Sequence, residues 1–76
     1  MPTVLRIDGW RVVIYPNDHP PAHVHVLGSG WVVVINVIGM QVREVIRTDE
    51  RTANEVLRQL ASYQDALLAE WRRFHG

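Results

Sequence analysis

The chain has 76 residues and no cysteine, so it is expected to form one small domain without disulfides or thiolate metal sites. Eight basic and eight acidic residues give a formal net charge of zero, which provides no general attraction to nucleic acid. No apolar run approaches the roughly 18 residues that span a bilayer, and no signal peptide is apparent. We therefore expect a single cytoplasmic domain over residues 1–76 and no membrane partner.

The first two-thirds of the chain predict short strands separated by turns. Segments rich in β-branched and aromatic residues cover residues 3–8, 10–15, 23–27, 31–38 and 42–46. They are spaced by about ten residues, with glycine or proline between them, which favours an antiparallel meander. The strands are therefore expected to form a sheet of four or five members within about residues 3–47.

The last third predicts one long amphipathic helix over about residues 50–74. Apolar residues recur there at intervals of mostly three and four, which places them on one helix face. Thr48, Asp49 and Thr52 are candidate N-caps, and Ser62 marks a place where the helix can break. The fold class expected is α+β, a small antiparallel sheet followed by one long C-terminal helix packed on one face.

The fourth predicted strand, residues 31–38, is apolar on both faces apart from Asn36. A strand of this kind is normally buried on both sides, yet one helix covers only one face of a sheet. Two explanations stay open. A second copy or a partner protein covers the other face, or the sheet curls so strongly that both faces close on the core.

The residues with the clearest chemistry lie in the string Asn17-Asp18-His19-Pro20-Pro21-Ala22-His23-Val24-His25-Val26. Proline fixes φ and disfavours helix in the residue before it, so His19 is expected on a rigid loop. Side chains alternate along a strand, so His23 and His25 are expected on the same sheet face. The three imidazoles titrate near neutrality and are common metal ligands.

These residues give the chain a resemblance to a known family. The string above, the segment Met1-Pro2-Thr3-Val4-Leu5-Arg6-Ile7-Asp8-Gly9 before it and the ending Leu67-Leu68-Ala69-Glu70-Trp71 resemble the small bacterial domain of unknown function 4160. Residues 31–41 depart from the family by being more apolar. The resemblance implies an uncharacterised protein, often encoded beside another small protein and suspected of belonging to toxin–antitoxin-type modules. It implies no catalytic residues.

Three functions are consistent with the sequence. The first is protein–protein binding through an apolar sheet face, with a second copy or a small partner encoded nearby. Asn17 and Asp18 then hold the turn, because such side chains bond to nearby backbone N–H groups. The second is metal binding, with Asp18, His19, His23 and His25 as candidate ligands and zinc as the candidate ion.

The third function is metal-free ribonuclease activity, as expected of a toxin, with RNA as the partner. Two of His19, His23 and His25 would serve as the general base and the general acid. Arg11 or Arg6 would hold the phosphate, and Tyr15 would donate a hydrogen bond to it. Whether the protein is an enzyme is left open by the sequence.

Overall fold

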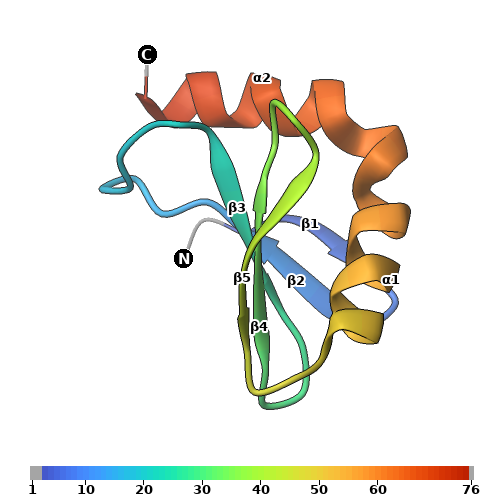
Figure 1. The fold of residues 1–76 in the computed structure, drawn as a ribbon. Helices are drawn as coiled ribbons and strands as arrows, with labels where there is room; N and C mark the ends of the chain where they lie inside the picture. Colours follow the sequence, from blue (N-terminus) through green and yellow to red (C-terminus); the bar gives the residue numbers. More distant parts are fainter. Residues whose placement is uncertain (1–2, 76) are drawn as a thin grey trace.

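The computed structural model describes residues 3–75 as an antiparallel sheet followed by a helical segment (Figure 1). The strands are β1 (Thr3–Ile7), β2 (Trp10–Val13), β3 (His23–Leu27), β4 (Val32–Asn36) and β5 (Gln41–Ile46). The helical segment comprises α1 (Glu50–Leu60), the 3₁₀ turn η1 (Ala61–Tyr63) and α2 (Gln64–His75). Each strand pairs with its neighbour in sequence, in the order β1-β2-β3-β4-β5. The predicted α+β fold is confirmed.

The helical segment begins at a side-chain cap and turns at its middle. Of the candidate caps, Asp49 takes the role, because its Oδ1 accepts from the N–H of Thr52 at 3.0 Å. The 3₁₀ turn occurs around Ser62, as the sequence predicts for a break, and α1 and α2 run in different directions on either side of it (Figure 1). In the described part of the chain, neither helix is long and apolar enough to cross a membrane.

Helix α2 crosses the end of the sheet at which β3 begins and β4 ends (Figure 1). At its start, Nε2 of Gln64 donates to the carbonyl oxygens of Val37 and Ile38, at 2.8 and 2.9 Å. Towards its end, the ring of Trp71 lies 5.3 Å from that of His23. The two contacts join α2 to the connection between β4 and β5 and to the first residue of β3.

The core lies between one face of the sheet and the helices. Val12, Val26 and Val33 are adjacent in the strand register and fully buried on that face. Val56 and Leu60 of α1 are also fully buried and belong to the same apolar cluster. Each such side chain contributes roughly 1.5–3 kcal/mol to folding when it is removed from water.

Strand β4 is buried on both faces within a single chain. Ile35 is 0% exposed on the core face, and Val34 is only 3% exposed although it points the other way. In the register, Val34 lies between His25 of β3 and Glu44 of β5. Burial of β4 therefore does not require a second copy, in agreement with the curled-sheet explanation, and oligomerisation stays a prediction.

Candidate functional site

The candidate site lies on the sheet face opposite the valine core. Strand β3 alternates, so Val24 and Val26 are buried in the core and His23 and His25 point to the other face. The register places His25 beside Val34 of β4. The prediction that the two imidazoles share a face is confirmed by this alternation.

A tight turn brings the carboxylate of Asp18 to the histidines. The N–H of Asp18 donates to the carbonyl oxygen of Tyr15 at 3.0 Å, which closes a turn with Pro16 as its second residue. Proline favours this turn position because its φ is already set. The turn directs the connection between β2 and β3 back over the start of β3.

Three side chains converge at this point. Oδ2 of Asp18 lies 3.2 Å from Nε2 of His23 and 3.7 Å from Nδ1 of His25. One possible ligand atom from each of the three residues lies within 4.8 Å of those of the other two. We call Asp18, His23 and His25 the triad. Its side chains are 23%, 7% and 23% exposed, so the cluster is largely buried.

The hydrogen bond made by Nδ1 of His23 determines which ring nitrogen carries the hydrogen in the neutral ring. Nδ1 of His23 lies 2.8 Å from the carbonyl oxygen of Pro21. A carbonyl can only accept, so Nδ1 carries a hydrogen and donates it. In the neutral ring Nε2 is then an acceptor, and it is this atom that faces the Asp18 carboxylate.

Polar atoms without hydrogen-bond partners gather around the triad. Among residues 3–75, four buried side-chain atoms have no partner; they are Asp18 Oδ2, His25 Nδ1, Asn36 Oδ1 and His75 Nε2. The first two belong to the triad, and Asn36 pairs with His23 in the register of β3 and β4. Unpaired buried polar atoms are costly, so their concentration here indicates a site rather than a packing defect.

His25 is held in its neutral form at neutral pH. Its pKa lies below the ordinary value of 6.5, chiefly because burial disfavours the charged ring. The Asp18 carboxylate opposes this shift, and His23 adds to it. The ring of Tyr15 also packs edge-on against His25, with centroids 4.9 Å apart. A neutral imidazole can accept a proton or bind a cation.

Two residues of α2 extend the site on the other side of His23. Trp71 packs against His23, and His75 stacks on Trp71 with ring centroids 3.7 Å apart. Nδ1 of His75 lies 3.0 Å from the carbonyl oxygen of Trp71. These contacts were not expected from the sequence.

The other predicted site residues lie outside the triad. His19 and Asn17 are exposed on the connecting loop, and His19 does not belong to the group of converging ligand atoms. Tyr15 contacts His25, as described. Arg11 donates from Nη2 to Oγ1 of Thr3 at 3.1 Å. The guanidinium proposed to hold a phosphate is thus engaged with β1.

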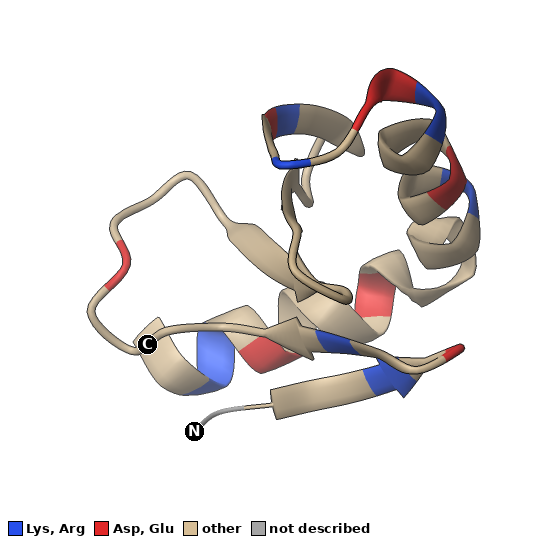
Figure 2. Ribbon diagram, turned by 90° about the horizontal axis from the view of Figure 1, so that it is seen from below, with Lys and Arg blue, Asp and Glu red and all other residues tan. Residues whose placement is uncertain are grey.

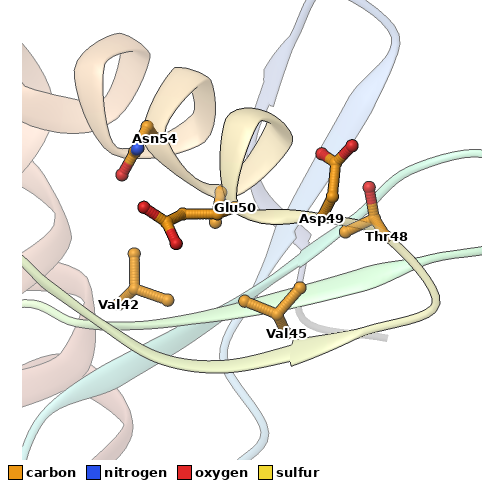
Figure 3. A pocket seen from close by; sticks show the side chains of 7 residues that line it. Val42, Val45, Thr48, Asp49, Glu50 and Asn54 are labelled. Atoms are coloured by element: carbon orange, nitrogen blue, oxygen red, sulfur yellow. The ribbon is translucent and has the colours of Figure 1, made fainter.

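A second surface with exposed apolar residues lies along β5, at the edge of the sheet. Val45 and Ile46 are 37% and 39% exposed, and Ile38 in the preceding turn is 67% exposed. An open groove of about 570 Å³ runs between β5 and α1 (Figure 3). It is lined by Val42, Val45, Thr48, Asp49, Glu50, Ala53 and Asn54.

One known protein family matches the chain, and the match includes the residues of both surfaces. The family described as domain of unknown function DUF4160 matches residues 9–72. The chain belongs to the DUF4160 family. The resemblance inferred from the histidine motif is thereby confirmed, and the matched residues of this DUF4160 protein include the whole triad and β5. No curated protein and no solved structure matches the chain.

Proposed function

We propose that this DUF4160 protein is a protein-binding module that pairs with a partner protein through β5, as one component of a toxin–antitoxin-type pair. The proposal rests on the position of β5 at the edge of the sheet and on the exposure of its residues. It is last in the sheet order, and five of its six residues are exposed. An edge strand presents unpaired backbone N–H and C=O groups, which a strand of another protein can bind.

The side chains near the C-terminal end of β5 support an apolar contact. Val45 and Ile46 are consecutive, so they point to opposite faces of the sheet and flank the unpaired backbone edge. The groove between β5 and α1 lies next to Val45 (Figure 3). A strand added at this edge would cover both apolar side chains and complete the backbone hydrogen bonds.

The charges of β5 disfavour two of the registers in which a second copy could pair with it. Antiparallel pairing of two copies centred on Glu44 places this carboxylate opposite itself, and centring on Arg43 does the same for the guanidinium. Like charges directly opposite one another destabilise a strand pair. A homodimer nevertheless stays a prediction, and it is one outcome of the experiment below.

The ribonuclease alternative has less support. Acidic and basic residues alternate along α1, whereas in α2 the basic residues are confined to the last turn (Figure 2). Arg58 pairs with Glu55 and Arg73 pairs with Glu70, so these guanidinium groups are already neutralised. Arg11 is bound to Thr3. The positive charge that remains for a phosphodiester backbone includes the pair of Arg11 and Arg6, which lie opposite each other in the register of β1 and β2.

The test is co-purification with the product of the neighbouring gene. Ile46→Lys should weaken the complex because it places a charge in the apolar contact, whereas Ala69→Lys, at an exposed position of α2, should leave it intact. Sedimentation of the free chain shows whether it is a monomer. Retention of the partner by Ile46→Lys, or its loss in both variants, would show that β5 is not the binding edge. A stable dimer of the free chain would replace the heteromeric proposal with the homomeric one.

A further inference from the structure

We propose that the triad Asp18, His23 and His25 binds one divalent transition-metal ion, with zinc as the ion that suits it best. This site is separate from β5 and does not depend on the partner proposed above. The inference rests on the arrangement of donor atoms and on the hydrogen bonds that the triad does not make.

The first argument is that acceptors face acceptors. Nδ1 of His23 donates to Pro21, so whenever the ring is neutral its Nε2 directs a lone pair at Oδ2 of Asp18, 3.2 Å away. Oδ2 is buried, and it has no hydrogen-bond partner. Two lone pairs at this distance repel each other unless a cation or a proton lies between them. A metal ion satisfies both atoms at once.

The second argument is that Nδ1 of His25, like Oδ2 of Asp18, is a buried atom whose hydrogen-bonding capacity is unsatisfied. It is buried and has no hydrogen-bond partner, and at 3.7 Å from Oδ2 of Asp18 it is too far for a hydrogen bond. A single shared proton cannot satisfy His23 and His25 together with Asp18. A metal ion accepts a lone pair from all three.

The separations match those of a tetrahedral zinc site. Zinc binds imidazole nitrogen and carboxylate oxygen at about 2.0–2.2 Å, so neighbouring ligands are about 3.4 Å apart. The distances from Asp18 Oδ2 to the two nitrogens, 3.2 and 3.7 Å, lie on either side of this value. One ring nitrogen of His23 lies within 4.8 Å of one of His25, so one ring has to move for both to bind the same ion.

The surroundings hold the most buried ligand in place. The Pro21 carbonyl sets the tautomer of His23, and Trp71 packs against its ring. Hydrogen bonds from the second imidazole nitrogen to a carbonyl are the usual way in which proteins orient a metal-binding histidine. His23 is therefore already positioned to bind through Nε2 before the ion arrives.

The ligand chemistry selects the class of ion. Two imidazole nitrogens with one carboxylate suit zinc and other first-row transition metals, whereas calcium and magnesium prefer oxygen ligands alone. Three protein ligands leave a position of tetrahedral zinc for water or an external ligand. The side chains of Asp18 and His25 are each 23% exposed, although their donor atoms Oδ2 and Nδ1 are buried.

The experiment is a calorimetric titration of tag-free protein with zinc chloride. Wild type should bind one ion per chain, and so should His19→Ala, which changes an exposed histidine of the same loop outside the triad. Asp18→Asn and His25→Gln remove one ligand each, and they should weaken binding by roughly tenfold or more. Circular dichroism in a chelator checks that both variants fold.

Two results would overturn the proposal. One is the absence of saturable binding at one ion per folded chain. The other is loss of binding in His19→Ala as large as that in His25→Gln, which would show that the loop histidines bind zinc without the triad. If Asp18→Asn or His25→Gln fails to fold, cobalt(II) titration of wild type decides. Tetrahedral binding gives intense visible absorption, and its absence counts against the site.

Discussion

Nε2 of His23 and Oδ2 of Asp18 lie 3.2 Å apart, while the other nitrogen of the same ring is bound to the Pro21 carbonyl. The contact joins the loop after β2 to the first residue of β3. His23 also packs against Trp71 of α2. A ligand that stabilises the contact between His23 and Asp18 therefore links the loop, the sheet and α2. This connection leads to the first prediction.

Zinc should raise the melting temperature of the wild-type chain, and a chelator should reverse the effect. An ion that binds only the folded state stabilises it by about 2.7 kcal/mol when its concentration is 100 times the dissociation constant. Differential scanning calorimetry with and without zinc measures this shift. Asp18→Asn serves as the control and should show a much smaller shift. Equal shifts in both proteins would mean that the ion binds elsewhere.

Without metal, stability should fall as the pH is lowered from above 6.5. The pKa of His25 is lowered in the folded state, first by burial and then by His23 and Arg43, against the opposite effects of Asp18 and Glu44. The unfolded chain therefore binds more protons, so stability is present above about pH 6.5 and is lost as the pH falls through the folded pKa.

Urea unfolding at several pH values in a chelator measures this dependence. His25→Gln removes the titrating group, so the decline between pH 7.5 and 5.5 should become shallower in this variant. Identical declines in wild type and variant would show that other groups, and not His25, cause the pH dependence.

Substitution by glutamate should separate the buried strand β4 from the exposed edge β5. Val34 is 3% exposed, so Val34→Glu buries a charge and should unfold the domain, because small domains are stable by only about 5–15 kcal/mol. Val45 is 37% exposed, so Val45→Glu should leave the fold intact and affect only partner binding. Circular dichroism distinguishes the two outcomes. A folded Val34→Glu variant would show that the second face of β4 is open.

Asn36→Leu should stabilise the isolated chain. Oδ1 of Asn36 is buried without a hydrogen-bond partner, in a strand that is otherwise apolar. Replacing such a group by an apolar one removes a desolvation cost of about 1–3 kcal/mol. Chemical denaturation measures the change. A destabilised variant would mean that the amide makes a stabilising interaction, for example with a bound water.

Much of this site could be predicted from local sequence. Strand alternation placed His23 and His25 on one face, and the proline turn places Asp18 within reach of them. The exclusion of His19 could not be predicted, since its position depends on how the loop turns after Asp18. The contact between Trp71 and His23 depends on the direction of α2, which local periodicity does not determine.

The same limit applies to the fold. Periodicity predicted the strands and the helix, because apolar spacing follows local geometry. Whether Val34 is covered depends on how strongly the sheet curls and on its neighbours His25 and Glu44. These contacts join segments distant in the sequence, so apolar content alone left two explanations open.

X-ray absorption spectroscopy of the zinc-loaded protein tests the metal site most directly, because it counts the ligands around the ion. We predict two imidazole nitrogens and oxygen ligands at about 2.0–2.2 Å in wild type and in His19→Ala. His25→Gln should lose one imidazole from this shell. A shell of oxygen atoms alone in wild type, or one that loses an imidazole in His19→Ala, would contradict a zinc site formed by Asp18, His23 and His25.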